Sequence, residues 1–575
     1  MENPMKRKHL MIICFSALLF LVVVFGGIKE QQWSSDASIS VDVISEGGTE
    51  EVKLWLGPGE MYYLFLPSYA DLSQVQIRRN LLGSISLDYQ QVSRGMNLGQ
   101  FSLEEPVALI HDPYFGYQWN ELTVKQSAGV PTLYIDVRSG NMDYIHAQKG
   151  NKEAGTMRLY TADGQLDSTA VVESLQGHGN STWQSWLEKK PYSLRLSQDT
   201  DLLGLGAGSK WVLLADAYDL SAIKNKMTYD LAKNAGMPYA PDCQWVDLYL
   251  NGVYSGLYLL TERNEIHSNR VDVPLESSFL VSWESEGRMI AQGYPYVKTE
   301  RGTIIRVHQS GLSLDRVQAL WQSAENAIFA EDGMDPVTGK QWQDLIDLDS
   351  WAKLFMIDEI SGDYDGGKIS KFFYYKETDG VGKIYAGPVW DKDDSFAAGH
   401  WSTTPPNCIV ASRSNILNGK EQRLFRGLSE KEAFSSRISE LYATTFRPLL
   451  EDLCAQGIEG YAQQIADAAE LSEFRMGLGY NPEEYRVIQE YLEARIEFLD
   501  AYWLEKEDFC YVHVFSPSEG CGGLYAVRPG DPIICLPEYD PDAGLWNWYL
   551  EETEEPFDVK QPILEDMNLI LKKTA

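Results

Sequence analysis

Apolar residues in the second half of the chain recur every three or four positions, which is the spacing of one face of an amphipathic helix. This pattern predicts helices over 314–330, 341–361, 420–450, 457–473 and 482–504. In the last segment the apolar face would consist of Tyr485, Ile488, Leu492, Ile496 and Leu499. A face of this kind packs against a core, so these residues are assigned to structure rather than to a site.

The first half shows short alternating apolar and polar stretches separated by turn residues, which predicts β-strands. Residues 40–128 are expected to form a small all-β accessory domain, and a second set of strands begins at 130–137. Asn251-Gly252 between two strand patterns predicts a hairpin, and 219–235 has the pattern of a capped helix. We therefore expect an α+β domain with a β-rich N-terminal half, a helical C-terminal half and a cleft between them.

The N-terminus combines a basic segment at 1–9 with an apolar run at 10–28. The run is long enough to span a membrane, and the basic residues before it place the bulk of the chain outside the cytoplasm. We expect a transmembrane signal anchor at the cell membrane, with a cleaved signal peptide and secretion as the alternative. Residues 29–128 would then form a polar linker followed by the accessory domain.

The chain carries 49 Lys and Arg against 83 Asp and Glu, a formal charge of −34. Such a surface repels nucleic acid and attracts cations or basic proteins, although acidity alone also keeps an exported protein soluble. An acidic C-terminal extension at 506–575 contains Cys510, Cys521 and Cys535, and a disulfide there would be compatible with export. With 8 His and no Cys-x-x-Cys spacing, a structural zinc site is disfavoured.

The first candidate site is Gly-His-Gly-Asn-Ser-Thr-Trp at 177–183. Two glycines allow backbone amides to approach an anion, and the hydroxyl side chains can donate as well, which suits a phosphate. The next segment, 189–196, has a strand pattern with basic side chains that could hold phosphate as point charges. The plain alternatives are an ordinary glycine turn and a solvated edge strand.

The second candidate is the loop from Asp363 to Ser370, which follows a predicted helix. Asp365 precedes two glycines there, and a carboxylate in such a loop is well placed to act as a base toward a hydroxyl group. Ser370 follows Asp365 at the spacing at which protein kinases have a metal-binding Asn. A solvated turn is the alternative.

The third candidate is Trp-Asp-Lys-Asp-Asp at 390–394, which follows a predicted hairpin. In extended backbone Asp391 and Asp393 would face one side and Lys392 the other. Two carboxylates on one side suit a cation that bridges phosphate oxygens. An exposed acidic turn is the alternative.

Taken in order, these motifs resemble the CotH kinase family, which is named after a bacterial spore-coat protein. The resemblance rests on Gly179-Asn180-Ser181-Thr182-Trp183, Lys189-Lys190-Pro191-Tyr192, Asp365 with Ser370, and Gly387-Pro388-Val389-Trp390-Asp391 with Asp393. It implies an atypical protein-kinase-like domain over 130–505. Such a domain would use ATP and Mg²⁺ or Mn²⁺ to phosphorylate Ser or Thr of a basic surface or coat protein.

The resemblance also implies roles for particular residues. Asp365 would be the catalytic base. The implied metal ligands are Asp391, Asp393 and Ser370. The implied nucleotide-binding residues are Gly179, Asn180, Ser181, Thr182, Lys190 and Glu262.

Two positions depart from the family pattern: His178 stands where the family usually has Arg, and Asp363 where Asn is common. Both changes lower the positive potential expected near a polyanionic nucleotide. A catalytically weak or inactive structural or adhesive protein is therefore a second hypothesis. A carbohydrate-active enzyme is a third, suggested by 16 Trp and many carboxylates.

Overall fold

The computed structural model describes residues 39–78, 84–93, 95–112, 118–363, 365–396, 404–411, 416–417, 420–421, 423–516, 521–533 and 546–573. The expected membrane segment at 10–28 lies outside these ranges, and within them no helix is long and apolar enough to cross a bilayer. The chain divides into two compact units, Met1–Ser127 with Gly252–Tyr254, and Ala128–Asn251 with Ser255–Ala575.

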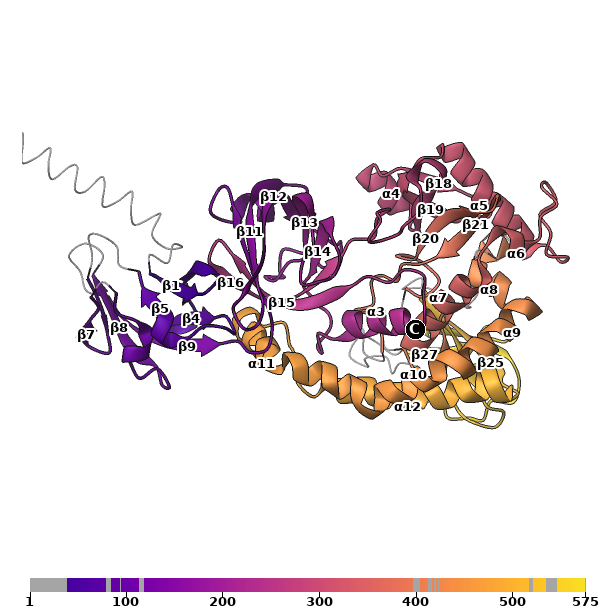
Figure 1. Ribbon diagram of the computed structural model, residues 1–575. Helices are drawn as coiled ribbons and strands as arrows, with labels where there is room; N and C mark the ends of the chain where they lie inside the picture. The colour runs from indigo at the N-terminus through magenta and orange to yellow at the C-terminus, as the bar shows by residue number, and fades with distance from the viewer. Residues whose placement is uncertain are drawn as a thin grey trace, which may run out of the picture. The chain divides into compact units, whose positions relative to one another are not determined.

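Two β-sheets build the first unit (Figure 1), with the strand orders β2-β1-β5 and β3-β4-β9-β8-β6-β7. The strands are β1 Ser40–Ser45, β2 Gly48–Lys53, β3 Trp55–Leu56, β4 Tyr62–Leu66, β5 Val75–Ile77, β6 Ser84–Leu87, β7 Gln90–Gln91, β8 Val107–Asp112 and β9 Gln118–Gln126. In β1, Val41 and Val43 are buried while Asp42 between them is half-buried, which is the period-two pattern of a strand with one covered face.

A closed barrel opens the second unit, with the strand order β10-β11-β12-β13-β14-β16-β15. Its strands are β10 Thr132–Val137, β11 Lys152–Tyr160, β12 Leu166–Gly177, β13 Tyr192–Thr200, β14 Gly208–Leu214, β15 Cys243–Leu250 and β16 Val253–Glu262. The predicted hairpin joins β15 to β16, and Asn251 and Gly252 at its turn have φ of 51° and 79°, as this type of turn requires. The barrel core is apolar and includes Leu133, Leu159, Leu194, Trp211 and Leu248.

A second sheet follows, with the order β18-β19-β17-β20-β21. Its strands are β17 Phe279–Trp283, β18 Tyr296–Lys298, β19 Ile304–Ser310, β20 Phe372–Thr378 and β21 Val381–Ala386. Trp283 and Phe373 of this sheet pack against Trp321 and Trp351 of two helices, with ring centroids 4.8 to 6.3 Å apart. This buried aromatic cluster fixes the helices on the sheet and supports the loops at its end.

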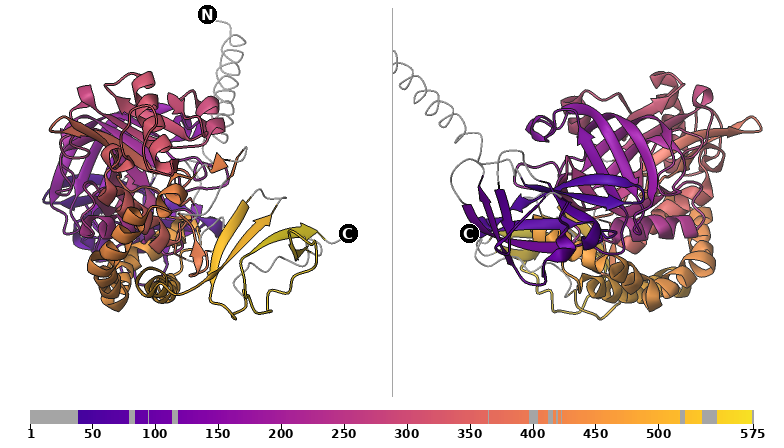
Figure 2. Two further views of the ribbon diagram at one scale, coloured as in Figure 1. Left: turned by 90° about the vertical axis from the view of Figure 1, so that its right-hand side faces the viewer. Right: turned by 60° about the vertical axis from the view of Figure 1, so that its left-hand side comes forward.

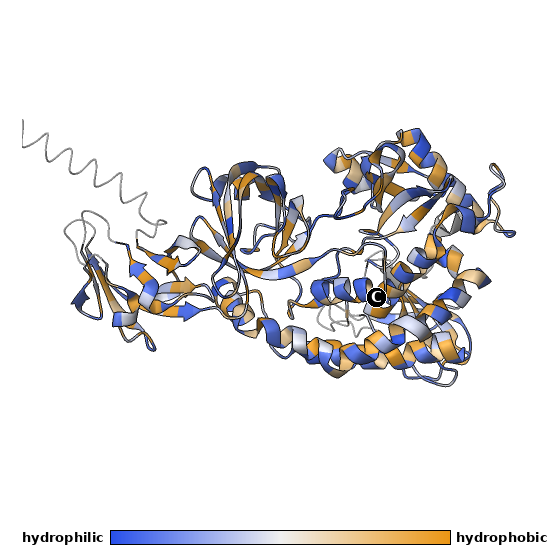
Figure 3. Cartoon of the chain, viewed as in Figure 1, coloured by the Kyte–Doolittle hydropathy of each residue, from blue (hydrophilic) through white to orange (hydrophobic). Residues whose placement is uncertain are grey.

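Helices dominate the rest of the unit, so the structure is α+β as predicted. The helices of this unit are α2 Asp143–Ala147, α3 Lys224–Asn234, α4 Glu286–Gln292, α5 Leu314–Phe329, α6 Trp342–Leu345, α7 Leu348–Ser361, α8 Leu424–Ser429, α9 Glu432–Leu441, α10 Arg447–Asp452, α11 Ile458–Met476 and α12 Glu484–Leu499. Hydrophobic and hydrophilic residues alternate along α11 and α12 in Figure 3, as expected of helices with one buried face.

Three predicted helices have different bounds. The helix expected over 219–235 begins at Lys224. The helix expected over 341–361 is α6 followed by α7, because Ile346 is extended and forms a β-bridge with Ile384. The helix expected from 420 begins at Leu424, because Lys420–Glu421 pair as a short strand, β24, with Ile416–Leu417, β23. In both of these places a local strand pairing replaces helical backbone. The segment expected as one helix over 420–450 is also interrupted at Lys431, whose backbone is extended, so α8 and α9 are separate helices.

A third sheet, with the order β22-β26-β25-β28-β27, contains the strands described in the C-terminal extension. Its strands are β22 Cys408–Ile409, β25 Cys510–Ser516, β26 Cys521–Val527, β27 Trp546–Leu550 and β28 Met567–Lys573, and β25 to β28 are yellow in Figure 2. Directly after β22, the N–H groups of Val410 and Ala411 donate to the Glu359 carboxylate of α7 at 3.1 and 3.0 Å. Cys510 is a free thiol, so it does not form the disulfide considered for the extension, and Cys535 lies outside the described residues.

Candidate active site

A cavity of about 330 Å³ is lined by residues of both the barrel and the second sheet. The barrel side includes the loop at 177–182, and the sheet side includes residues of β19 and α4. The loops at 365–370 and 390–393 complete the lining. Folding therefore brings the three candidate motifs to one cavity, whose volume is in the range of about 300–1,000 Å³ typical of small-molecule sites.

The glycine loop is fixed at the edge of this cavity. Gly179 has φ of 71°, and a β-carbon there would collide with the Thr182 hydroxyl, so the position requires glycine. Lys149 holds the loop, since its Nζ donates to the Gly179 carbonyl at 2.5 Å and to Oδ1 of Asn180 at 2.8 Å. Ser181 and Thr182 line the cavity as well.

Lys190 and Glu262 lie outside the lining of this cavity, although the resemblance implied that they bind nucleotide. The Lys190 Nζ donates to the carbonyls of Gln184 and Leu187 at 2.6 and 2.7 Å. Glu262 is buried at the end of β16, where it pairs with Arg270. In this structure both side chains stabilise local backbone, so a phosphate in the cavity would need other cations.

Four other basic side chains line the cavity, namely Lys149, Arg263, Arg288 and Arg306. Arg288 is paired with Glu284 at 2.9 Å. Within the described part of the chain, neither Arg263 nor Arg306 forms an ion pair with a carboxylate. The cavity therefore has positive charge available for an anion.

His178 lies among these cations and is neutral. Burial, and then the charges of Arg263, Lys149 and Arg306, lower the pKa of its imidazole to about 3. Its Nδ1 lies 2.9 Å from the Ser193 hydroxyl. From the sequence we expected a lower positive potential here, because His178 replaces an Arg. Lys149, Arg263 and Arg306, which come from three other segments, supply that positive charge instead.

Asp365 lies on the loop that follows α7, where Gly362 ends the helix in the left-handed conformation (φ 60°). The backbone N–H of Asp365 donates to Oδ1 of Asp363 at 3.0 Å, and its side chain lines the cavity. Burial, and then the charge of Asp363, raise the pKa of the Asp365 carboxyl to about 6. A carboxylate of this kind is ionised at neutral pH yet more basic than usual, which suits a general base. Ser370 lines the same cavity.

Asp391 and Asp393 line the cavity, whereas Lys392 between them does not. We expected this alternation from an extended backbone, but Asp391 has a left-handed φ of 64°, so a turn presents the two carboxylates. Burial, and then the charge of Asp391, raise the pKa of Asp393 well above its usual value. Trp390 anchors the turn by stacking on Tyr229 of α3, with ring centroids 6.1 Å apart.

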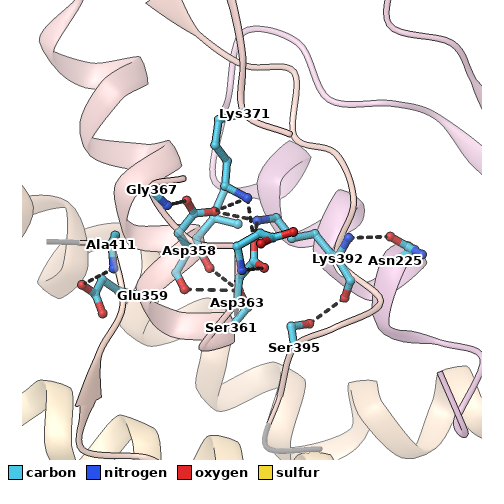
Figure 4. Close-up of polar contacts among 12 residues, drawn as sticks. Asn225, Asp358, Glu359, Ser361, Asp363, Gly367, Lys371, Lys392, Ser395 and Ala411 are labelled. Carbon is cyan, nitrogen blue, oxygen red and sulfur yellow. Dashed lines mark hydrogen bonds and ion pairs between the residues drawn. The ribbon is translucent and has the colours of Figure 1, made fainter. Parts of the chain in front are cut away.

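Lys392 is fully buried and belongs to a network of two lysines and two aspartates (Figure 4). Its Nζ pairs with Oδ1 of Asp358 at 2.6 Å and with Oδ2 of Asp363. The Lys371 Nζ lies 2.6 Å from Oδ2 of Asp363 and 3.6 Å from Oδ1 of Asp358. These lysines hold the pKa of Asp363 well below its usual value despite burial. The negative charge that Asp363 adds is therefore neutralised locally.

The donor set fits a nucleotide with a hard cation. No group of three His, Cys, Asp or Glu side chains in the described ranges is close enough to hold a metal ion by itself. Mg²⁺ does not need one, because it commonly uses one or two carboxylates together with phosphate oxygens and water. Asp391 and Asp393 could supply those carboxylates, since both line the cavity, where burial and then the charge of Asp391 raise the pKa of Asp393.

Fold and cavity together define a mixed α+β protein whose polar site has a glycine loop and cations on one side and loop-borne carboxylates on the other. A comparison with protein-family models matches residues 175–499 to the CotH kinase protein model. The match spans more than half of the chain and includes all three motifs, so the chain belongs to the CotH kinase family. No curated protein matches the chain.

Sequence reasoning missed the basic residues of the cavity. Lys149, Arg263 and Arg306 come from three separate segments, and none lies in a motif that could be recognised by spacing. Lys149 also precedes the family-matched region. Only the closed barrel and the packing of the second sheet bring these side chains together.

Proposed function

We propose that this protein is an ATP-dependent protein kinase that phosphorylates Ser or Thr hydroxyls of a basic protein, with Mg²⁺ or Mn²⁺ as the cation. One observation carries the proposal: the glycine loop, the basic side chains and the carboxylates of Asp365, Asp391 and Asp393 line the same cavity. Membership of the CotH kinase family supports nucleotide and divalent-cation use in general.

On the donor side, the backbone amides of 179–182 and the cations Lys149, Arg263 and Arg306 would hold the nucleotide phosphates. Asp391 and Asp393, with Ser370, would hold the cation. When bound, the cation would neutralise charge on the phosphate oxygens. The protein's own contribution is to position these groups and exclude alternatives, which is most of what phosphoryl transfer requires.

On the acceptor side, Asp365 would accept the proton of the Ser or Thr hydroxyl. As the hydroxyl oxygen bonds to the γ-phosphorus, the bond from that phosphorus to the bridging oxygen breaks and ADP leaves. The proton passes to the Asp365 carboxylate. Its pKa of about 6 keeps the group ionised, and so able to accept a proton, at neutral pH.

The partners follow from charge and from the N-terminal pattern. A formal charge of −34 favours a basic acceptor protein and disfavours nucleic acid. We further propose that the apolar run at 10–28 anchors the protein in the cell membrane, with the bulk outside the cytoplasm, or directs its secretion.

Transfer of labelled γ-phosphate from ATP to a basic Ser-containing protein, together with calorimetry of nucleotide binding, tests the proposal. Asp365→Asn should lower kcat by about 10²- to 10⁴-fold while nucleotide binding persists. Asp391→Asn should abolish the dependence of binding on Mg²⁺. Asp394→Asn is the matched control, because Asp394 belongs to the same acidic run but does not line the cavity.

A wild-type protein that binds no nucleotide with or without Mg²⁺ would refute this function. Nucleotide binding without transfer to any basic acceptor would instead support the structural or adhesive alternative.

A further inference from the structure

Lys392 connects the two loops that carry the proposed base and the proposed metal ligands. It lies between Asp391 and Asp393, yet its Nζ bonds to Asp363 of the other loop and to Asp358 of α7 (Figure 4). The residue is 0% exposed, so water does not compete for these bonds. One side chain therefore spans both loops.

Through Asp363, Lys392 is also connected to the backbone of Asp365, the proposed base. Oδ2 of Asp363 accepts from Lys392, and Oδ1 of the same carboxylate accepts the N–H of Asp365 at 3.0 Å. A displacement of Lys392 would thus reach Asp365 through a single carboxylate.

The backbone of Lys392 is fixed as firmly as its side chain. Its N–H donates to Oδ1 of Asn225 at 2.9 Å, and its carbonyl accepts from the Ser395 hydroxyl at 2.6 Å. Asn225 lines the cavity and also donates to Oδ1 of Asp216 at 3.0 Å. Neither end of Lys392 can shift without breaking a bond.

The charges of the network resist separation. Two lysines balance two aspartates in the interior, and moving one loop away would leave buried charges without partners, which is costly in a low-dielectric interior. The two loops are therefore expected to hold one relative position rather than a range of them.

We propose that Lys392 is a positioning residue, which sets Asp365 relative to Asp391 and Asp393 so that the base and the metal ligands form one rigid unit. The proposal rests on the kinase function proposed above. Lys371 provides a matched control, because it is only 1% exposed and pairs with the same two aspartates, but it does not belong to the 390–393 loop.

The kinetic test compares Lys392→Met with Lys371→Met, since each removes one cation from the same network. Lys392→Met should raise the Mg²⁺ concentration for half-maximal phosphotransfer about tenfold or more, as loss of a residue supporting metal ligands commonly does. Nucleotide affinity without Mg²⁺ should not change. Lys371→Met should leave the Mg²⁺ requirement unchanged, and an equal shift in both variants would overturn the proposal.

A second measurement needs neither nucleotide nor activity, so it separates this proposal from the proposed function. Amide hydrogen exchange should accelerate in both 363–371 and 389–396 for Lys392→Met, but only in 363–371 for Lys371→Met. If Lys392→Met does not fold, Asp363→Asn/Lys392→Met removes one charge of each sign and should show the same acceleration in both segments. Unchanged exchange in 363–371 in that double variant would refute the connection.

Discussion

Two groups of aspartates lie close together along the chain yet have opposite electrostatic environments. Asp358 and Asp363 are buried and bonded to lysines, and the pKa of Asp363 is lowered. Asp365 and Asp393 face the cavity without an ion pair among the described residues, and their pKa values are raised. The lysine counter-ions, rather than burial, thus explain why the pKa values of the two groups shift in opposite directions. The protein neutralises the acids that hold its loops and leaves uncompensated two acids that line the cavity.

Removing a lysine from the neutralised group should have the largest effect on stability. Lys392→Met leaves two buried aspartates with one cation, so the free energy of unfolding should fall by about 3–5 kcal/mol. Denaturant unfolding followed by Trp fluorescence measures this loss. The double variant Asp363→Asn/Lys392→Met should recover much of it, because one charge of each sign is removed. A double variant as unstable as the single would contradict the account of a neutral network.

The raised pKa of Asp365 predicts that this residue makes the protein less stable as the pH rises. The folded-state pKa of Asp365 is about 6 against an ordinary value of 3.8, so the folded protein binds this proton more tightly than the unfolded chain. Wild type should therefore lose stability relative to Asp365→Asn as pH rises from about 4 to 6, by up to about 3 kcal/mol. Unfolding curves for both proteins across this range measure the difference.

The same titration predicts the activity profile. Because a base must be ionised, kcat should rise with pH through about 6 and level off at neutral pH. A flat profile between pH 5 and 7, with the chemical step rate-limiting, would mean that Asp365 is not the group that accepts the proton.

The basic side chains allow a smaller but direct comparison. Arg263 lines the cavity and has no carboxylate partner among the residues that the structure describes, whereas Lys190 is bonded to two carbonyls outside the cavity. Arg263→Gln should weaken nucleotide binding about tenfold, as expected for loss of one charge-assisted bond. Lys190→Met should lower stability and leave the affinity unchanged. Calorimetry of nucleotide binding to both variants measures this difference. A loss of affinity confined to Lys190→Met would instead support the nucleotide-binding role that the resemblance implied for Lys190.

The smallest effect is expected at His178. Its imidazole is neutral, so His178→Gln keeps a polar group beside Ser193 and removes no charge. Nucleotide affinity at neutral pH should change by less than about twofold. A large loss would show that the imidazole is protonated when nucleotide binds.

Local features of the site could be predicted from the sequence. Gly179 is required by the conformation of its own loop. Along 391–393 the side chains alternate: Asp391 and Asp393 line the cavity, and Lys392 lies in the interior. The α5 helix also has almost the predicted bounds. In each case the determinant lies within a few neighbouring residues.

Features that depend on long-range packing could not be predicted. Lys149 and Arg306 reach the cavity from strands or loops far from the motifs. Lys190 lies outside the cavity lining because its long side chain turns back to carbonyls three and six residues away, which composition does not reveal. The break at Ile346 depends on a bridge to Ile384. Such contacts exist only once the sheets have formed.

The pairing of β22 with β26 sets the smallest piece of the chain that can fold intact. A fragment limited to the family-matched residues 175–499 would lack β25 to β28 and leave β22 as a bare edge, which invites pairing between molecules. It would also lack β10 and β11, so the barrel could not close. Because the segment after β22 is bonded to Glu359, next to Asp358, damage at that edge would reach the loop that carries Asp363 and Asp365. An expressed fragment should therefore begin before residue 130 and retain the C-terminal extension.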